Sequence, residues 1–600
     1  MRVMHRPIPF DAFSVCPSSL PEMLPKKSLK SLLAPFERNA VLAPRLPAWR
    51  SSLVVALLSL AFAALALRAL WVQIIEHDFH AAQGQKRHRL TLELDAMRGQ
   101  IVDRNGSLLA VSLATYEIWA EPQRVERSAY EALAQSLTVS VPELEKHLAS
   151  ERAFVLLKRD VDLQTANRIM RLGLTGVTQI AVSKRFYPEG DSVAHVVGFT
   201  GLDDNGQEGV ELAANTALNG QAGARDVIRD RLGRIVHELG PPVPARHGET
   251  VRLTIDRRIQ QLAYVQLQAA LARHGAQAGS AIVLDARNGE ILALANAPSF
   301  DPNRQAQRAG RALRNRALTD TFEPGSTIKP LAVALALDAG TVLPTTRVDT
   351  APGHYTIGRN TIHDTSNHGT ITIADALAKS SNVAMAKLAL NMPAERIWGK
   401  YREYGIGLAP PLPFPGVAAG KLRPWKSWRP IEQATMAYGY GLSTSLLQIA
   451  QAYTAFAGDG TLRPATLIAG GSASSSAASS DTPPASSGRR VTTPGTAAAI
   501  RDMLEAAAAP GGTAQAARIE GYRVGGKTGT AWKHVGTGYA KGKYRSLFVG
   551  IAPIDAPRII VAVMIDEPVG GAFYGGKVAA PVFASIAGGA LHLLGVPPDI

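Results

Sequence analysis

The sequence predicts an α/β chain of the α+β type, in which an N-terminal membrane helix precedes a β-rich domain and a larger mixed domain. Three features indicate this architecture. Residues 51–75 are almost continuously apolar. Asn-Gly turns between alternating apolar and polar residues predict β-hairpins over 98–111 and 280–298. Between these hairpins, Asp256 precedes the segment 257–274, which predicts a capped helix.

The apolar segment 51–75 is long enough to cross a bilayer as a helix, because each residue adds about 1.5 Å and the hydrocarbon core is about 30 Å thick. Its single charge, Arg68, lies toward the far end, where a long side chain reaches the interface, and Trp71 suits the same depth. A cleaved signal peptide is the weaker alternative, since the segment is longer than an ordinary signal core and lacks an evident A-x-A exit. We therefore expect a single-pass anchor.

The charge that precedes the anchor predicts its orientation. Residues 1–50 contain eight Lys or Arg residues and three acidic residues, and basic flanks stay on the cytoplasmic side of a membrane. We expect a proline-rich cytoplasmic tail over 1–50, a helix in the bacterial inner membrane, and residues 76–600 in the periplasm. This topology disfavours an ATPase, because the space outside the inner membrane is generally poor in ATP.

The composition is that of a globular protein with a basic surface. Hydrophobic residues make up 46% of the chain, charged residues 19%, and the net charge is +15. No long Lys/Arg block, zinc-ligand spacing or RNA-binding signature accompanies this charge, so we expect an anionic polymer or membrane beside the protein and no nucleic acid. Cys16 is the only cysteine, which excludes an intramolecular disulfide. We expect neither a metal nor an organic cofactor.

The exported part divides into two predicted domains, 76–250 and 251–600. In the first, we expect short helices and loops over 126–180, and the glycines of 185–211 suit either tight turns or a binding role. Residues 471–489 are rich in Ser, Ala and Pro and poor in bulky apolar residues. They predict a disordered surface insert in the second domain.

The segment FEPGSTIKP, residues 322–330, contains the first candidate for chemistry. Ser326 opens an apolar helical run in which Lys329 lies on the same face. A serine hydroxyl is a poor nucleophile until a base removes its proton, and a lysine is such a base only when burial or a nearby positive charge lowers its pKa. Lys329 is the one lysine in the sequence with a serine three residues before it.

Two further motifs follow in the order found in acyl-serine enzymes. KSSNVAMAKLAL contains Ser380, which can relay a proton, and Asn382, which can bind a substrate amide, although Ser and Asn equally suit a helix cap. Lys527 begins the motif K-T-G-T, which forms one wall of the active site in S-x-x-K enzymes. Its positive charge can also keep Lys329 neutral.

The third motif has a competing interpretation. GYRVGGKT, residues 521–528, fits the phosphate-binding pattern G-x-x-x-x-G-K-[ST] of P-loop ATPases. A P-loop turns into a helix directly after its lysine, whereas Gly529 and strand-forming segments follow here. The three motifs together favour acyl-serine chemistry and leave the P-loop ATPase as a remote alternative.

At these motifs the sequence resembles the class B penicillin-binding proteins, and among them the division-specific peptidoglycan D,D-transpeptidases. The resemblance covers about residues 50–600 and rests on RGQIVDRNG, RFYPEG, AHVVGFTG, GQEGVE, FEPGSTIKP, KSSN, GYGLSTSLLQIA, GGKTGTAWK and FYGGKVAAPVF. It implies that 76–250 is a pedestal (dimerisation) domain and that 251–600 is a β-lactamase-like transpeptidase domain, in which helices flank an antiparallel sheet.

The resemblance also implies roles for single residues. Ser326 corresponds to the family's nucleophile and Lys329 to its general base, while Ser380, Asn382 and Lys527 complete the predicted catalytic set. The backbone N–H groups of Ser326 and Thr530 correspond to the oxyanion hole. The substrate-binding residues implied in the same way are Thr528, Gly529, Thr530, Tyr544, Phe573 and Tyr574.

The implied reaction cross-links two peptidoglycan stem peptides through an acyl-serine intermediate, and β-lactams are the expected covalent inhibitors. The implied partners are lipid-linked precursors, an FtsW-type glycosyltransferase and other division proteins, and the implied location is the division septum. An elongation-type transpeptidase, a β-lactam sensor and a β-lactamase of the same fold are the alternatives that the sequence leaves open.

Overall fold

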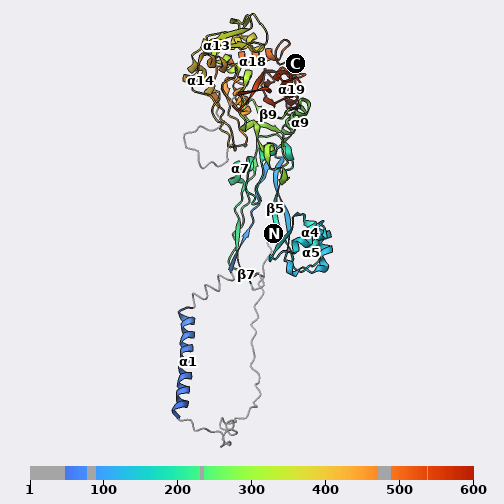
Figure 1. Ribbon diagram of the computed structural model, residues 1–600, viewed down its shortest axis with the longest axis vertical. Coiled ribbons are helices and arrows are strands. Elements are labelled where there is room, and N and C mark those ends of the chain that lie inside the picture. The colour runs from blue at the N-terminus through green and yellow to red at the C-terminus, as the bar shows by residue number, and fades with distance from the viewer. Residues whose placement is uncertain (1–47, 77–88, 230–234, 471–487, 537) are drawn as a thin grey trace, which may run out of the picture. The chain divides into compact units, whose positions relative to one another are not determined.

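The computed structural model describes the chain in five stretches, residues 48–76, 89–229, 235–470, 488–536 and 538–600 (Figure 1). Residues 1–47 of the predicted tail (1–50) and residues 471–487 of the predicted Ser-rich insert therefore lie outside the described residues. Arg489, which we placed in that insert, begins strand β16 (Arg489–Arg490). The chain forms two compact units, Met1–Thr91 with Asp226–Leu239 and Leu92–Arg225 with Gly240–Ile600.

The first unit contains helix α1 (Ala48–Ile74), which coincides with the predicted anchor except that it begins three residues earlier and ends one earlier. Its stretch Trp49–Ile74 has a mean hydropathy of 2.4 and no part of it is buried within the protein. Near the end of the helix, Arg68 forms an ion pair of 3.3 Å with Glu76. Length, composition and exposed apolar side chains make this helix consistent with a single-pass anchor.

The second unit begins with strands that include the predicted Asn-Gly hairpin. Strand β2 (Ile101–Val102) pairs antiparallel with β3 (Leu108–Ala120), and Gly106 in the turn has a φ of 86°. The long strand β3 also pairs with β4 (Val155–Val161) and β5 (Val177–Phe186). The first predicted hairpin is therefore present.

The expectation of only helices and loops over 126–180 is wrong. Helices α3 (Tyr130–Leu137), α4 (Val141–Leu148) and α5 (Leu163–Arg171) are present, and Figure 1 shows α4 and α5 beside β5. Strand β4, however, lies wholly inside that range and β5 begins in it. Both strands pair with β3, so their partner lies far away in the sequence, where local patterns do not register it.

Two glycines of the 185–211 run, Gly198 and Gly209, allow close backbone packing. Helices α6 (Ala194–Val197) and α7 (Gly209–Ala213) meet there. A Cβ added at Gly198 would lie 1.8 Å from the carbonyl oxygen of Glu208, and Gly198 has a φ of 76°. These contacts give a structural reason for the glycines, which is the first of the two interpretations that the sequence left open.

The same region contains a buried ionic cluster, formed by Arg98, Arg185 and Glu211. The Glu211 carboxylate on α7 accepts hydrogen bonds from Arg98 Nε at 2.6 Å and from Arg185 Nε at 2.7 Å. All three side chains are almost completely buried. The cluster joins the segment before β2, strand β5 and helix α7.

The two predicted domains of the exported part contact each other where the second begins. Strand β8 comprises only Val251–Arg252 of the predicted VRLTID strand and pairs in parallel with β2. As predicted, Asp256 caps helix α9 (Arg257–His274) by accepting a hydrogen bond from Arg258 N. In addition, the Asp103 carboxylate accepts a hydrogen bond from Arg257 N at 3.2 Å.

The C-terminal part is built on a five-stranded antiparallel sheet in the order β10-β9-β19-β18-β17. Strands β9 (Ala278–Asp285) and β10 (Ile291–Ala297) form the second predicted hairpin. The other three strands are β17 (Gly525–Val535), β18 (Gly538–Ala552) and β19 (Ile559–Asp566). The mixed, antiparallel character expected for this domain is thus confirmed.

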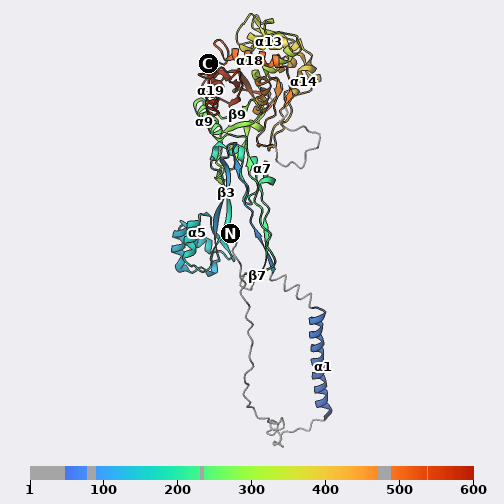
Figure 2. The same ribbon diagram turned by 180° about the vertical axis from the view of Figure 1, so that it is seen from behind.

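Helices cover both faces of this sheet. On one face, α9 and α19 (Gly575–Leu593) pack beside each other, as both views of the ribbon show (Figures 1 and 2). Phe583 of α19 contacts Phe548 of β18, with ring centroids 4.7 Å apart. Helix α19 is also apolar and long enough to cross a membrane, but half of it is buried, so it is a core helix.

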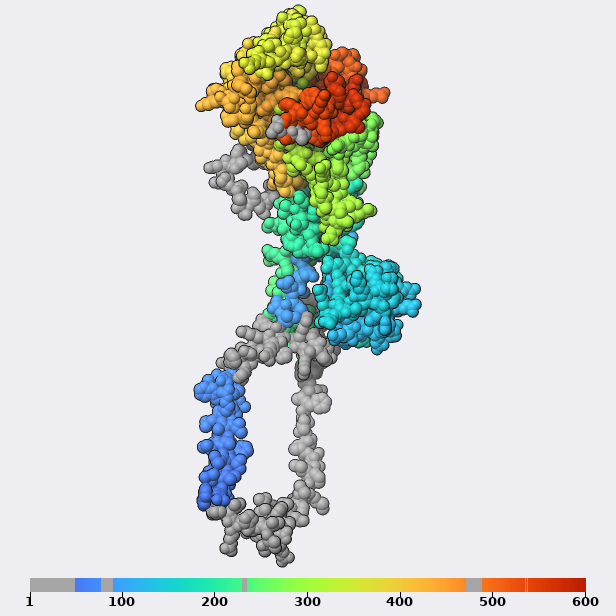
Figure 3. All heavy atoms as spheres, viewed as in Figure 1, coloured from blue at the N-terminus to red at the C-terminus, as the bar shows by residue number. Residues whose placement is uncertain are grey.

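The other face carries the helices that position the candidate site. They include α11 (Lys329–Asp338), α13 (Asn382–Leu390), α16 (Leu446–Ala452) and α18 (Pro494–Ala508). Alternate residues of β19 point to this side, among them Ile560 and Met564, because side chains of a strand alternate between faces. In the space-filling view, the middle and C-terminal parts of the chain meet in one body (Figure 3).

The remaining named elements are short. Strands β1 (Arg89–Leu94), β6 (Gly223–Arg229) and β7 (Ile235–Glu238) form a sheet in the order β1-β6-β7. Three two-stranded pairs are β11 (Arg347–Asp349) with β14 (Thr370–Thr372), β12 (His354–Ile357) with β13 (Asn360–His363), and β15 (Thr461–Leu462) with β16. The other helices are α8 (Asn215–Leu218), α10 (Arg316–Thr319), α12 (Ile373–Ala378), α14 (Ala394–Glu403), α15 (Pro430–Met436) and α17 (Thr454–Ala457).

Candidate active site

The serine turn, residues 324–328, is held by backbone contacts. It is a short 3₁₀ helix (Gly325–Ile328) that continues directly into α11 at Lys329. A Cβ at Gly439 would lie 2.1 Å from the carbonyl oxygen of Gly325, and a Cβ at Gly529 would lie 2.9 Å from that of Pro324. Only glycine permits this approach, so the turn is fixed between the 439 loop and strand β17.

Ser326 lies in a cavity of about 700 Å³, which Thr528, Thr530 and Trp532 of strand β17 also line. The predicted site residues that line it come from five separate segments of the chain. These are Ser326, Ser380, Asn382, Thr528, Thr530, Tyr544, Phe573 and Tyr574. Lys329, Lys527 and Gly529 do not line the cavity, but the first two side chains are fully buried behind it and Gly529 carries the contact with the serine turn.

Lys329 connects the serine turn to the Ser380–Asn382 segment. Its Nζ lies 2.7 Å from the Ser380 carbonyl oxygen, 2.8 Å from Asn382 Oδ1 and 3.2 Å from Ser380 Oγ. A neutral amine has two N–H groups and one lone pair. The carbonyl and amide oxygens can only accept, so they take both N–H groups and leave the lone pair free to receive a proton from a hydroxyl.

The electrostatic environment favours that neutral form. Burial lowers the pKa of Lys329 well below its ordinary value, and the charge of Lys527 lowers it further, whereas Asp364 opposes both effects. The sequence predicted Lys527 as a source of positive charge. In the structure burial has the larger effect on the pKa of Lys329, because this side chain is fully buried.

The Ser380–Asn382 segment contains both a helix cap and the contacts with Lys329. Ser381, not Ser380, caps α13, since its Oγ accepts a hydrogen bond from Ala384 N. Ser380 has a φ of 63°, a left-handed backbone conformation that is unfavourable for a residue with a side chain. This geometry directs both its carbonyl oxygen and its hydroxyl to Lys329.

Asp364 is a part of the site that the sequence reasoning missed. Its carboxylate accepts hydrogen bonds from Ser381 Oγ at 2.6 Å and from Val383 N at 3.0 Å, and it also bonds to Asn382 N. It therefore binds the N-terminus of α13 from outside the helix. The motif around it, HDTSN, has no pattern that distinguishes it from an ordinary polar loop.

The K-T-G-T motif lies entirely in strand β17. Burial lowers the pKa of Lys527 to about 7, and its Nζ lies 3.3 Å from Thr528 Oγ1. Thr530 Oγ1 accepts a hydrogen bond from Gly575 N at the start of α19. A strand, not a helix, continues after Lys527, and this excludes the P-loop arrangement.

Aromatic rings line one side of the cavity. Tyr544 and Phe573 stack with centroids 4.1 Å apart, Phe573 contacts Tyr574 at 4.5 Å, and Trp532 contacts Tyr544 at 4.5 Å. We call Trp532, Tyr544, Phe573 and Tyr574 the aromatic wall. The sequence predicted three of its members and missed Trp532, although this residue follows Thr530 by two positions on the same face of β17.

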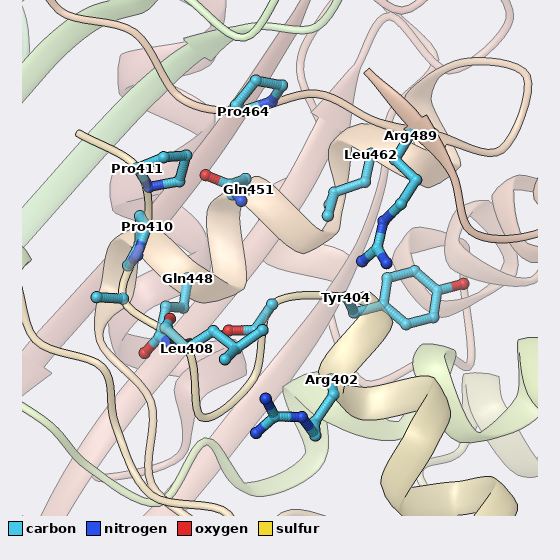
Figure 4. Close-up of a pocket in the computed structure, with 12 residues that line it drawn as sticks. Arg402, Tyr404, Leu408, Pro410, Pro411, Gln448, Gln451, Leu462, Pro464 and Arg489 are labelled. Atoms are coloured by element: carbon cyan, nitrogen blue, oxygen red, sulfur yellow. Dashed lines mark hydrogen bonds between the residues drawn. The ribbon is translucent and has the colours of Figure 1, made fainter. Parts of the chain in front are cut away.

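Another cavity, of about 240 Å³, lies elsewhere in the same unit and includes Arg402, Gln451 and Arg489 (Figure 4). None of the predicted site residues is among the twelve that line it. It brings guanidinium and amide groups together without a serine or lysine, so it offers no acyl-transfer chemistry.

The site therefore combines the Ser326 hydroxyl within a rigid turn, the buried Lys329 amine with its lowered pKa, and the buried Lys527 amine beside threonine hydroxyls. This set can form and break an acyl-serine bond with a substrate that carries a carboxylate.

The family comparisons agree with this class of site. Residues 279–588 match the penicillin-binding protein transpeptidase domain, and residues 93–253 match the penicillin-binding protein dimerisation domain. The chain belongs to the class B penicillin-binding proteins, and it is a peptidoglycan D,D-transpeptidase of the serine type.

Particular relatives cover nearly the whole chain. The chain is 41% identical over 583 residues to the probable peptidoglycan D,D-transpeptidase PenA of Neisseria meningitidis, covering 96% of this chain and 98% of that protein. It is 36% identical over 560 residues to the peptidoglycan D,D-transpeptidase FtsI of Escherichia coli, covering 92% and 93%.

Solved structures are also similar. The transpeptidase domain of Burkholderia pseudomallei penicillin-binding protein 3 is 48% identical, with a TM-score of 0.52, and covers 58% of this chain and 98% of its own. A peptidoglycan synthetase from Bifidobacterium adolescentis is 27% identical, with a TM-score of 0.67, and covers 85% and 98%.

Proposed function

We propose that Ser326 is the nucleophile of this transpeptidase and Lys329 its general base, with Ser380, Asn382 and Lys527 as further catalytic groups. The observation that carries the assignment is the position of Lys329, whose amine is buried behind the Ser326 cavity and bonded to Ser380 and Asn382. A buried lysine with a lowered pKa, and with no ion pair to a carboxylate among the described residues, is an expensive group to retain for stability alone.

In the first step, Ser326 Oγ attacks the carbonyl of the penultimate D-Ala of a stem peptide. The hydroxyl proton passes to the neutral Lys329 amine, directly or through Ser380. The carbonyl oxygen becomes an oxyanion that the N–H groups of Ser326 and Thr530 stabilise. The peptide C–N bond then breaks, terminal D-Ala takes the proton, and the acyl group remains on Ser326.

The D-Ala carboxylate is the part of the donor that this site can hold through charge. Lys527 supplies the charge, and the hydroxyls of Thr528 and Thr530 supply hydrogen bonds. Asn382 is available for a backbone amide of the stem, and the aromatic wall for apolar contact. A β-lactam carries a carboxylate beside a strained amide, so it meets the same groups and acylates Ser326.

Labelling with a fluorescent penicillin tests the assignment. The wild-type protein should form an adduct that survives denaturation and maps to the peptide containing Ser326, and Ser326→Ala should form none. MgATP in excess should not compete. An unlabelled Ser326 in folded protein, shown by an unchanged melting curve, would sink the proposed site.

We further propose that the chain acts at the division septum, with its catalytic domain in the periplasm and helix α1 in the inner membrane. Similarity to FtsI over 92% of the chain supports a division role, and the basic residues before the anchor support the orientation. Lipid-linked precursors, an FtsW-type glycosyltransferase and other division proteins are the partners that this role requires.

Two fusions test the cellular assignment. A fluorescent fusion to the N-terminus should concentrate at midcell, and a signal along the side wall would favour the elongation-type role instead. A reporter that is active only in the periplasm, fused after residue 90, should be active. Activity of a cytoplasmic reporter at the same position would reverse the orientation.

A further inference from the structure

A cavity of about 760 Å³, which we call the second cavity, adjoins the cavity of Ser326 and is distinct from the one in Figure 4. The two share Asn382 and Trp532, which line both. Glu323 lines the second cavity and precedes Ser326 by three residues, so their Cα atoms are at most about 11 Å apart. The second cavity therefore opens beside the bond that the nucleophile forms.

The Glu323 carboxylate has uncharged hydrogen-bond donors around it. Its carboxylate accepts hydrogen bonds from Tyr539 Oη at 2.9 Å and from Gly441 N at 2.8 Å, both of which are uncharged donors. In the part of the chain that the structure describes, no ion pair joins Glu323 to a lysine or arginine. Burial, and then the charge of Glu323, raises the pKa of neighbouring Tyr440 to about 12, so the charge acts within the cavity.

The other acid of this cavity differs in this respect. The Glu432 carboxylate forms ion pairs of 2.7 Å with Arg423 and 3.2 Å with Arg429. Its charge is satisfied within the protein, whereas that of Glu323 remains available. Lys541 also lines the cavity but forms no ion pair with Glu323. The cavity therefore offers an anionic group, Glu323, and separately a cationic group, Lys541.

We propose that this second cavity binds the acceptor stem peptide, and that Glu323 receives the ammonium group of the acceptor beside the acyl-serine. The proposal rests on the proposed role of Ser326. Transpeptidation needs a cationic second substrate at a place that the first substrate does not fill, and it needs that amine to win over water. The Glu323 carboxylate satisfies both needs, because it lies in a cavity that shares Asn382 and Trp532 with the cavity of Ser326.

The second step balances as follows in this arrangement. The acceptor binds as an ammonium and releases one proton to solvent to become a neutral amine. Its nitrogen forms a C–N bond with the acyl carbon, and the bond between that carbon and Ser326 Oγ breaks. The second nitrogen proton passes through Lys329 to Ser326 Oγ. No redox change occurs, and both enzyme groups return to their initial state.

A purely structural role is the competing explanation for Glu323, because its two hydrogen bonds join the 441 loop and the β17–β18 hairpin to the serine turn. Glu323→Gln separates the two explanations. The amide oxygen still accepts hydrogen bonds from Gly441 N and Tyr539 Oη, but the charge is lost. Glu323→Asp keeps the charge and moves it back by one methylene group.

The test measures how the acyl-enzyme divides between two products. The full-length protein in detergent is given a thioester analogue of the acyl donor with increasing D-alanine, an acceptor whose amine is an ammonium group at neutral pH, and the ratio of aminolysis to hydrolysis is measured. This ratio is set after acylation, so it does not depend on how fast Ser326 reacts. Glu520→Gln, which removes an exposed acid elsewhere in the same domain, is the matched control.

We expect Glu323→Gln to lower the aminolysis-to-hydrolysis ratio at least tenfold by raising the KM for the amine, with partial recovery in Glu323→Asp and no change in Glu520→Gln. A wild-type ratio in Glu323→Gln would overturn the acceptor site while leaving the role of Ser326 intact. If Glu323→Gln does not fold, Glu323→Asp takes its place. A fall in the aminolysis-to-hydrolysis ratio of Glu323→Asp that only equals the fall in its acylation rate would also overturn the acceptor site. Absence of any acyl-enzyme in the wild type would instead reject the proposed function.

Discussion

Two clusters of buried charged residues in this chain solve the same physical problem differently. In the cluster of Arg98, Arg185 and Glu211, the carboxylate accepts a charge-assisted hydrogen bond from each arginine. In the active site, Lys329 and Lys527 are equally buried, yet neither forms an ion pair with a carboxylate in the described part of the chain. Burial instead lowers both of their pKa values.

The difference shows that burial of charge does not by itself mark a catalytic group. A paired charge is satisfied and unreactive, and its removal leaves the partner charge buried alone. An unpaired lysine escapes the same cost by giving up its proton, and it thereby becomes a base. The comparison predicts opposite effects for substitutions in the two clusters.

Lys329→Ala is expected to give the largest effect on activity. Acylation by penicillin should slow by about 10²–10⁴-fold, the usual contribution of a general base, because the group proposed to accept the serine proton is gone. The free energy of unfolding should not fall, since a costly buried amine is removed. Stopped-flow acylation and chemical denaturation measure the two quantities, and a strongly destabilised but fully reactive variant would contradict the comparison.

Glu211→Ala should show the reverse pattern. It leaves Arg98 and Arg185 without their carboxylate, so the free energy of unfolding should fall by about 3–5 kcal/mol, while the folded fraction acylates at the wild-type rate. Glu121→Ala, which breaks the exposed pair with Arg124, is the control and should cost less than about 1 kcal/mol. Equal losses in the two variants would show that the buried cluster contributes nothing special.

The pH dependence of acylation sharpens the comparison for Lys527. Its pKa of about 7 means that the ammonium is present below pH 7 and is lost as the pH rises. The carboxylate of a β-lactam should therefore bind best below pH 7, and the second-order acylation rate should fall above it. Lys527→Ala should be slower throughout and lack this alkaline decline. A decline that persists in the variant would assign it to another group.

The smallest predicted effect concerns His195, a third buried group, which forms no ion pair in the described part of the chain and contacts the Ala312 carbonyl oxygen at 2.7 Å. Burial lowers its pKa to about 4, whereas the unfolded chain titrates near 6.5. Between these values the unfolded state holds more protons, so stability is present above pH 6.5 and is lost as the pH falls toward 4. Denaturation across this range measures the loss, and His195→Gln should reduce it.

The extent to which the sequence predicted this structure varies with the kind of interaction. The hairpins at Gly106 and Gly289 and the cap at Asp256 depend on local chemistry, and all three are confirmed. Strand β4 was missed because its partner β3 lies far away in the sequence. In the site, motifs identified residues that the structure brings together, whereas Asp364 acts by capping another segment and has no motif of its own.

For a related reason, the sequence could not show that the charge of Glu323 lacks an ion pair among the described residues. Its neighbours in space, Gly441 in a loop and Tyr539 in strand β18, lie more than a hundred residues away in the sequence. The motif FEPGSTIKP gives no sign of whether a cation pairs with its carboxylate. Only the folded chain shows that the charge of Glu432 is satisfied and that of Glu323 is not.

The backbone contacts around the serine turn limit how this protein can change under antibiotic selection. A side chain at Gly439 or Gly529 would collide with main-chain atoms, which cannot rotate aside as a side chain does. Substitutions at these two positions should therefore inactivate the protein. Resistance substitutions should instead occur at residues that contact the drug but do not support the serine turn. Trp532 and Tyr574 of the aromatic wall are partly exposed, and we expect resistant lineages to vary there first.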